Sequence, residues 1–157
     1  MNDSTDLEYA HAVSSIHNRL FFRIFQVAST LERQSQKELG ISSVQWSVLG
    51  ALSRPKADDG MLFTDLVEYL GVSRQNLDGV LKRLERDAQV TRQADPADRR
   101  AKRVFLTDKG RKDWANLQEK IYEFYNQSLK GFSFDDKVAF VHYLNRVQQQ
   151  MKEIDLS

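Results

Sequence analysis

A chain of 157 residues with 41% hydrophobic and 29% charged residues suits one domain or two small lobes sharing a core, and excludes wholesale disorder. The absence of cysteine excludes disulfides, thiolate metal sites and thiol-based redox sensing. The net charge of +1 conceals a basic middle, because residues 74–112 carry twelve Lys and Arg against six Asp and Glu, whereas both flanking segments are acidic. This polarity is expected if only the middle of the chain meets a polyanion, although a solvated charged face would look the same.

The opening sequence MNDSTDLEYAH is acidic and has no apolar core, so it does not resemble a signal peptide. No apolar run approaches the roughly 18 residues that a membrane span requires. We therefore expect a cytoplasmic protein without a membrane partner.

Residues 7–38 contain no Gly or Pro and form a long amphipathic pattern that Gly40 is expected to end. The wide apolar stripe predicts a helix that touches more than one neighbour. Its apolar members are Val13, Ile16, Leu20, Phe21, Ile24, Phe25, Val27, Ala28 and Leu31.

Three shorter elements are expected next. Ser42 or Ser43 can cap a second helix, which should end before Pro55 because a residue preceding proline avoids helical geometry. The run PKADDG reads as a loop, and residues 61–63 as a short extended piece. Thr64 is then the expected N-cap of a third helix.

The sequence around Gly71 suits a helix-turn-helix, in which a tight turn containing Gly joins two helices. Gly71 should stop the third helix, and Ser73 should cap the next one, from Arg74 to Asp87. Two consecutive short helices of a bundle would look similar. The outward face of the second helix decides between these readings.

That outward face combines amides with cations, a mixture suited to contacts with adenine, guanine and phosphate. Its members are Gln75, Gly79, Lys82 and Arg86, flanked by Asn76, Asp78 and Arg83. The inward set is Leu77, Val80, Leu81 and Leu84. Gly79 lowers helix stability, so it either permits close backbone approach to a partner or is a tolerated defect. We interpret this segment as a DNA recognition helix.

Two candidate strands, Val90–Gln93 and Arg103–Leu106, flank the turn ADPADRRAK. Cationic Arg99, Arg100 and Lys102 lie at or beside its tip, where a basic hairpin can reach phosphates or the minor groove. Asp98 is expected to orient the guanidinium of Arg100 through a charge-assisted hydrogen bond. A solvated loop with local ion pairs is the alternative.

The C-terminal part is predicted to be two helices. Thr107 should cap the first, Gly131 should break it, and the second should begin near Ser133 or Phe134. The last helix carries a heptad-like apolar seam, which predicts packing against another subunit. The seam consists of Phe140, Leu144, Val147, Met151 and Ile154.

The segments VSRQNLDGVLKRLERDAQVTR and DPADRRAKRVFLTDKGR resemble the MarR (multiple antibiotic resistance regulator) family of bacterial transcription factors. The resemblance extends over residues 20–130. Its most specific part is the motif formed by Asp98, Arg100, Val104, Leu106, Thr107, Lys109 and Gly110. The chain departs from the common family pattern at Asp87-Ala88-Gln89, where a Gly usually follows the helix.

The resemblance implies a mainly α fold with a small β-wing. A winged helix-turn-helix DNA-binding lobe, residues 41–106, would join a helical dimerisation lobe made of residues 1–40 and 107–157. A homodimer would bind double-stranded DNA at a pseudo-palindromic operator, and the protein would be nucleoid-associated when bound. By motif position Arg100 would enter the minor groove. The expected DNA-binding residues are Ser73, Arg74, Gln75, Asn76, Lys82, Arg86, Asp98, Arg99, Arg100 and Lys102.

The resemblance also implies repression that is relieved by a small aromatic effector, a carboxylic acid, phenol or thioester. A pocket for such a molecule needs apolar walls with a few cationic or hydrogen-bonding groups. The candidate residues are His11, His17, Arg19, Phe21, Trp46 and Asn116. A histidine beside an apolar stripe is more often an interfacial residue than a ligand contact, so this set is a hypothesis.

Other classes of function are disfavoured. His11 and His17 project in directions about 120° apart on a helix, and His142 is remote, so neither a metal site nor any cofactor is expected. No phosphate-binding glycine loop, nucleophile motif or acid–base constellation is present, so an enzyme is not expected. A ligand-independent winged-helix DNA-binding or architectural protein remains the alternative to a ligand-responsive repressor.

Overall fold

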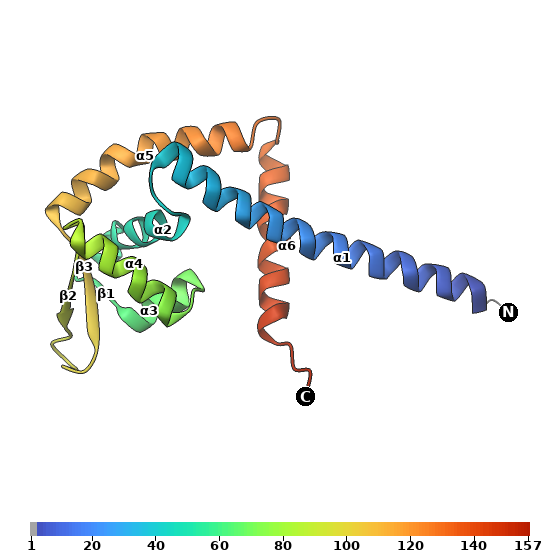
Figure 1. Cartoon of the computed structure of the whole chain (residues 1–157), viewed down its shortest axis with the longest axis horizontal. Coiled ribbons are helices and arrows are strands. Elements are labelled where there is room, and N and C mark those ends of the chain that lie inside the picture. Colours follow the sequence, from blue (N-terminus) through green and yellow to red (C-terminus); the bar gives the residue numbers. More distant parts are fainter. Residues whose placement is uncertain (1–2) are drawn as a thin grey trace. The chain divides into compact units, whose positions relative to one another are not determined.

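The computed structural model describes the backbone of residues 3–157 and the side chains of Tyr9 and residues 11–157. Helices dominate, and there is one small antiparallel sheet, two of whose three strands lie between α4 and α5 in the chain (Figure 1), which confirms the predicted fold class. The α-helices are α1 (Asp3–Gln34), α2 (Ser43–Leu52), α3 (Phe63–Leu70), α4 (Arg74–Arg86), α5 (Asp108–Ser128) and α6 (Phe134–Lys152). The strands are β1 (Met61–Leu62), β2 (Val90–Ala94) and β3 (Lys102–Leu106). Two short turns, the π-helical η1 (Ser35–Leu39) and the 3-10 helical η2 (Pro55–Ala57), follow α1 and α2.

The chain divides into two compact units, residues 1–118 and 119–157, and α5 runs from the first into the second. The first unit therefore contains the helix-turn-helix, the sheet and α1. The functional division into a DNA-binding lobe and a dimerisation lobe concerns the assembled protein and stays a prediction.

Polar side chains begin most of the helices where the sequence predicted caps. The Ser42 hydroxyl accepts a hydrogen bond from the Gln45 N–H at 3.0 Å, and Gln45 returns one to the Ser42 N–H. Ser133 and Asp136 form the same reciprocal pair at the start of α6, whereas the Ser73 hydroxyl at the start of α4 only accepts a hydrogen bond, from the Asn76 N–H. The prediction that Thr64 caps the third helix was wrong. The N-cap of α3 is Leu62, two residues before Thr64, and its side chain makes no capping bond.

Glycines in the left-handed conformation end the predicted helices. Gly40 follows η1 with φ of 71°, Gly71 follows α3 with φ of 65°, and Gly131 follows α5 with φ of 87°. Glycine alone adopts this conformation without a Cβ penalty, so these stops could be located from sequence.

The predicted hairpin forms the larger part of a three-stranded sheet with the order β1-β3-β2. Strands β2 and β3 pair in antiparallel register from Val90 opposite Leu106 to Ala94 opposite Lys102. The extended piece predicted at residues 61–63 is β1, and Met61 pairs with Val104. Because β1 precedes α3, the sheet ties the wing to the start of the helix-turn-helix.

One hydrophobic core joins α2, α3, α4 and the sheet. Its fully buried members are Val48, Leu49, Leu52, Leu66, Leu77, Leu81, Leu84, Val90 and Val104. The first turns of α5 close over this core, because the Trp114 ring packs against Gly50 of α2. A Cβ added to Gly50 would lie 3.0 Å from that ring. The core thus holds the recognition helix and the wing strands in one body.

Helices α1 and α6 leave many apolar side chains exposed. On α1 these are Ile16, Leu20, Phe21, Phe22, Ile24, Phe25, Val27 and Leu31. On α6 they are Phe134, Val138, Phe140, Val141, Tyr143, Leu144 and Met151. Among the described helices none is both long and apolar enough to cross a membrane. Exposed apolar area on this scale is typical of a surface that contacts another protein.

Candidate nucleic-acid interface

Helix α4 buries one face in the core and presents the opposite face to solvent. Leu77, Val80, Leu81 and Leu84 are buried, as their spacing predicted. The predicted reading residues of this segment are all exposed: Ser73, Arg74, Gln75, Asn76, Lys82 and Arg86. A methyl group added to Gly79 would meet nothing within 4 Å, so packing inside the chain does not require glycine there. The polar face is therefore free to meet a partner.

The cations on this face make weak contacts within the chain. The Arg74 guanidinium lies 5.2 Å from the centre of the Phe63 ring, a cation–π contact. The Lys82 ammonium lies 2.8 Å from the Asp78 carboxylate, and the Arg86 Nε lies 3.2 Å from that of Asp87. An isolated exposed ion pair contributes little to stability, so Arg86 remains available to phosphates or base edges, whereas the partner of Lys82, Asp78, is also bound by a second cation, Arg92.

The predicted wing residues lie at the tip of the β2–β3 hairpin or, for Lys102, at the start of β3 beside it. Asp98, Arg99, Arg100 and Lys102 are all exposed. The Asp98 carboxylate accepts a hydrogen bond from the backbone N–H of Arg100 at 2.9 Å, rather than from the guanidinium as expected. The short Asp side chain reaches the backbone two residues on, as in an Asx turn. Asp98 therefore shapes the turn that presents Arg100.

A buried carboxylate that was not among the predicted site residues, Asp95, anchors this turn. One of its oxygens accepts hydrogen bonds from the N–H groups of Ala97 and Asp98 at 2.8 and 3.1 Å. The other accepts from Arg103 Nε at 2.8 Å, and Arg103 also donates to the Gly60 carbonyl at 3.1 Å. The Arg103 guanidinium and these N–H groups hold the pKa of Asp95 below its usual value. Asp95 thus connects the wing tip to the loop before β1.

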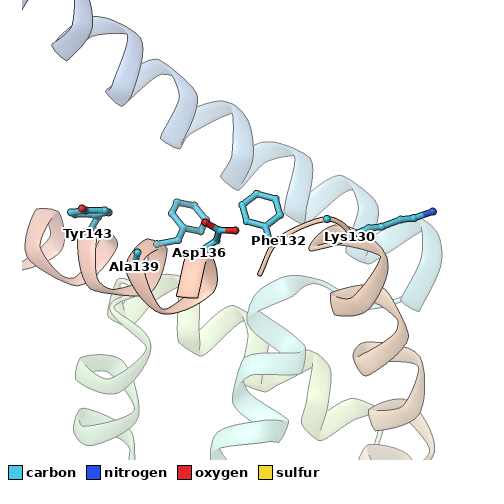
Figure 2. A pocket seen from close by; sticks show the side chains of 7 residues that line it. Lys130, Phe132, Asp136, Ala139 and Tyr143 are labelled. Atoms are coloured by element: carbon cyan, nitrogen blue, oxygen red, sulfur yellow. The ribbon is translucent and has the colours of Figure 1, made fainter. Parts of the chain in front are cut away.

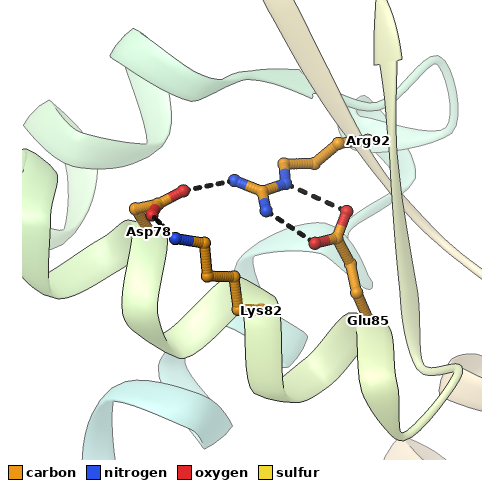
Figure 3. A network of polar contacts seen from close by, with 4 residues as sticks. All are labelled: Asp78, Lys82, Glu85 and Arg92. Carbon is orange, nitrogen blue, oxygen red and sulfur yellow. Dashed lines mark hydrogen bonds and ion pairs between the residues drawn. The ribbon is translucent and has the colours of Figure 1, made fainter.

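Arg92 of β2 connects the wing to the recognition helix (Figure 3). Its guanidinium donates to both oxygens of Glu85, at 2.9 and 2.6 Å, and to Asp78 at 2.6 Å. Hydrogen bonds to Glu85, and then to Asp78, raise the pKa of Arg92. The spacing of these residues in the sequence could have indicated this network. Arg92 shares a strand face with buried Val90, and Asp78 and Glu85 lie two helical turns apart on one face of α4.

A third link fixes the base of the wing to α5. Thr107 donates its hydroxyl hydrogen to the Ala88 carbonyl at 2.6 Å and accepts from the Gly110 N–H at 2.9 Å, so it caps α5 as predicted. Gly110 lies so close to Gln89 that an added Cβ would overlap the Gln89 carbonyl oxygen. The turn after α4 is therefore packed tightly against the start of α5.

Polar contacts among three side chains reinforce that junction. Gln89 donates to the Asp113 carboxylate at 2.9 Å, and the Lys109 ammonium lies 2.5 Å from the same carboxylate. Lys109 and then Gln89 hold the pKa of Asp113 below its usual value. The motif residue Lys109 thus supports the wing from within the chain.

The predicted effector residues are distributed over three helices of the first unit. His11, His17, Arg19 and Phe21 are exposed on α1, Asn116 is exposed on α5, and Trp46 of α2 is buried. The set remains a prediction.

An open cavity of about 590 Å³ lies instead at the turn between α5 and α6 (Figure 2). Its aromatic members project from α6 and the preceding turn. The lining residues are Lys130, Gly131, Phe132, Asp136, Ala139, Phe140 and Tyr143. Asp136 is engaged in capping α6 through Ser133, and none of the six predicted effector residues lines this cavity.

No group of three or more histidine or carboxylate side chains is arranged to hold a metal ion in the described part of the chain. His11, His17 and His142 are each exposed.

Comparison with known proteins gives a consistent result. A family model described as "MarR family" matches residues 39–101. The transcriptional activatory protein BadR of Rhodopseudomonas palustris is 43% identical over 150 residues, covering 93% of this chain and 86% of that protein. The homoprotocatechuate degradative operon repressor of Escherichia coli is 27% identical, covering 82% and 87%.

A solved structure shares both fold and sequence. The PcaV transcriptional regulator of Streptomyces coelicolor, solved in complex with its natural ligand, is 25% identical with a TM-score of 0.66. The alignment covers 85% of this chain and 89% of PcaV. These relatives are named as transcriptional regulators rather than enzymes, in agreement with the sequence analysis. The extent of the match to BadR, together with the family model, shows that the chain belongs to the MarR family of transcriptional regulators.

Proposed function

We propose that two copies of this chain bind a pseudo-palindromic operator in double-stranded DNA and release it when a small aromatic effector binds. The observation that carries the proposal is the pairing of an exposed amide-and-cation face on α4 with a basic wing tip. Both are fixed to one core. In this proposal α4 lies in the major groove, and Arg100 enters the adjacent minor groove.

The exposed apolar faces of α1 and α6 support the homodimer. Leu144 is 43% exposed and Phe140 is 47% exposed, although both belong to the predicted seam on α6. A single chain reads only half of a palindrome. A second copy would bring another α4 to a major groove one helical turn away, about 34 Å along the duplex.

One relative supports an aromatic effector, and another supports regulation by a ligand. The E. coli relative is named for an operon that degrades homoprotocatechuate, an aromatic acid, and PcaV was solved with its natural ligand. We propose that His11, His17, Arg19, Phe21, Trp46 and Asn116 contribute to the effector site once the dimer is formed. A 100-fold loss of DNA affinity would require that the effector prefer the released conformation by about 2.7 kcal/mol.

We propose repression as the output, and the BadR relationship favours activation as a second candidate. The E. coli relative is named a repressor, whereas BadR is named an activatory protein. The DNA-binding fold does not determine this choice, because the effect on transcription depends on where the operator lies relative to the promoter. In vitro transcription from the regulated promoter, with and without the protein, distinguishes the two.

The binding test uses a duplex that the protein selects from a randomised 30-base-pair pool. We expect a dissociation constant on the order of 10 nM or tighter and a steep loss of affinity with added salt. Arg100→Ala should weaken binding about tenfold or more. Lys130→Ala removes a cation far from the reading surface in the sequence and is the matched control. Equal affinity of the Arg100→Ala and Lys130→Ala variants would contradict the wing assignment.

The effector test uses benzoate, phenol and an aromatic coenzyme A thioester as probes. We expect at least one to raise the melting temperature and to release the selected duplex. If none of them acts while the selected duplex is bound tightly, the ligand-independent alternative is favoured.

A further inference from the structure

Asp78 lies at the centre of a chain of ion pairs that runs from Arg92 on the wing strand to Lys82 on the reading face of α4 (Figure 3). We call this chain, Glu85–Arg92–Asp78–Lys82, the relay. One carboxylate oxygen accepts a hydrogen bond from Arg92 Nη1 at 2.6 Å, and the other lies 2.8 Å from the Lys82 ammonium. Arg92 is held in turn by both oxygens of Glu85. The Lys82 ammonium is therefore connected, through Asp78, to a guanidinium that cannot move far.

The exposure of these side chains increases along the relay. The Arg92 side chain is 20% exposed, Asp78 is 39% exposed and Lys82 is 68% exposed. A bidentate Arg–carboxylate pair that is mostly covered is geometrically stiff, whereas an isolated surface Lys samples many rotamers. The inner end of the relay can therefore restrain its outer end, where the DNA is expected to lie.

The relay is also electrically balanced. Arg92 and Lys82 contribute two positive charges, and Asp78 and Glu85 contribute two negative charges. Hydrogen bonds from Lys82 and then from Arg92 lower the pKa of Asp78, so its carboxylate stays ionised at neutral pH. A carboxylate on the flank of the reading face opposes phosphates of any sequence, so its presence weakens non-specific attraction.

A free lysine on this face would follow any nearby phosphate and add to sequence-independent affinity. A lysine held at one place can instead donate to one base edge, as Lys does to the acceptors of guanine. We propose that Asp78 is a specificity-determining residue, which holds Lys82 for base readout and suppresses its non-specific contact with phosphate. This inference rests on the proposed function, since it presupposes that α4 reads DNA.

The test compares the full-length protein with Asp78→Asn, which keeps the shape of the side chain and removes its charge. The probes are the duplex that the wild type enriches from a randomised pool and a scrambled duplex of equal composition. Affinity for each is measured by fluorescence anisotropy over a salt series. Glu68→Gln is the matched control, because Glu68 is an exposed carboxylate on neighbouring α3 and its change removes the same charge.

We expect Asp78→Asn to bind the scrambled duplex more tightly and to lower the ratio of specific to scrambled affinity by about tenfold. Its salt slope on the scrambled duplex should steepen by about one, as for one additional phosphate contact. Adding Lys82→Met to Asp78→Asn should remove the extra slope. Glu68→Gln should change both affinities together and leave their ratio as in the wild type.

Three results would overturn the inference. The first is that Asp78→Asn and Glu68→Gln have the same ratio of specific to scrambled affinity and the same salt slope. This result would overturn the role of Asp78 and leave the proposed function intact. The second is that the steeper salt slope of Asp78→Asn persists after Lys82→Met is added, because the additional phosphate contact would then belong to a cation other than Lys82. If the wild type enriches no duplex, the proposed function and this inference fail together.

Discussion

Ala88 carries the backbone conformation that makes the turn after the recognition helix possible. Its φ is 57°, in the left-handed region that residues with a Cβ rarely adopt. The Ala88 carbonyl accepts the Thr107 hydroxyl, and the Gln89 carbonyl lies against Gly110, so the surrounding contacts hold the turn in place. In the common family pattern a glycine follows the recognition helix at this place. The structure shows that alanine keeps the glycine geometry.

Ala88→Gly should therefore stabilise the protein. Glycine removes the penalty of roughly 1–2 kcal/mol that a Cβ incurs in the left-handed conformation. It also increases the conformational entropy of the unfolded state, which lowers stability by about 0.5–1 kcal/mol. We expect a net gain of up to about 1 kcal/mol, seen as a rise of about 2–4 °C in the melting temperature.

Ala115→Gly on exposed, helical α5 is the control for this change and should lower the melting temperature, because glycine costs about 1 kcal/mol in a helix. A fall of equal size in both variants would mean that the turn places no special demand on residue 88.

Residues whose role depends on their immediate neighbours could be identified from sequence. Ser42, Ser73 and Ser133 cap helices through bonds to residues three positions on, so composition and spacing suffice. Arg92 and Asp95 act through partners that only the folded chain brings close. Arg92 reaches back seven and fourteen residues to Glu85 and Asp78.

At the scale of elements, features set by local sequence were predicted, and features set by contacts between distant residues were missed. The recognition helix and both hairpin strands follow from periodicity and turn residues, and each strand proved one residue longer than predicted. The pairing of β1 with β3 joins residues more than forty positions apart, and no local pattern specifies it. The start of α3 was misplaced because Leu62 makes no side-chain capping bond that a sequence signal could reveal.

The ionised carboxylate of Asp95 anchors the wing turn, so the stability of the wing should depend on pH. The folded-state pKa of Asp95 is depressed, mainly by Arg103. Its contribution is then fully present above the unfolded pKa of about 3.9, and it is lost as pH falls through the lower folded value. The wild type should lose this stabilisation between about pH 4 and the folded pKa.

Asp95→Asn should lower the melting temperature by several degrees at pH 7 and show a shallower acid decline below about pH 4, because Asn does not titrate. Thermal unfolding between pH 3 and pH 7 measures both effects. Asp108→Asn, an exposed carboxylate in the first turn of α5, serves as the control. Parallel pH profiles for the wild type and Asp95→Asn would contradict this role of the carboxylate.

At the scale of the whole molecule, most of the large apolar side chains that the described chain leaves exposed lie on α1 and α6. On α6 the exposed seam residues share one side of the helix, and Asn145 lies on the opposite side. If a second copy covers the seam, a charge placed there must be buried without a partner, which is strongly unfavourable.

Leu144→Glu should therefore weaken self-association at least about 100-fold and leave the protomer folded, because Leu144 is 43% exposed within the chain. Sedimentation velocity over a concentration series measures the association, and circular dichroism checks the helices. Asn145→Glu introduces the same charge on the other side and should remain dimeric. A Leu144→Glu variant as dimeric as Asn145→Glu would place the interface elsewhere.

The uncovered seam also has a consequence for the dose response of the regulated gene. If only the paired form spans both half-sites, operator occupancy at low abundance rises with the square of the chain concentration rather than in proportion to it. Halving the supply of the protein would then reduce occupancy about fourfold in that range. The apolar residues of α6 would set the abundance at which the gene begins to respond.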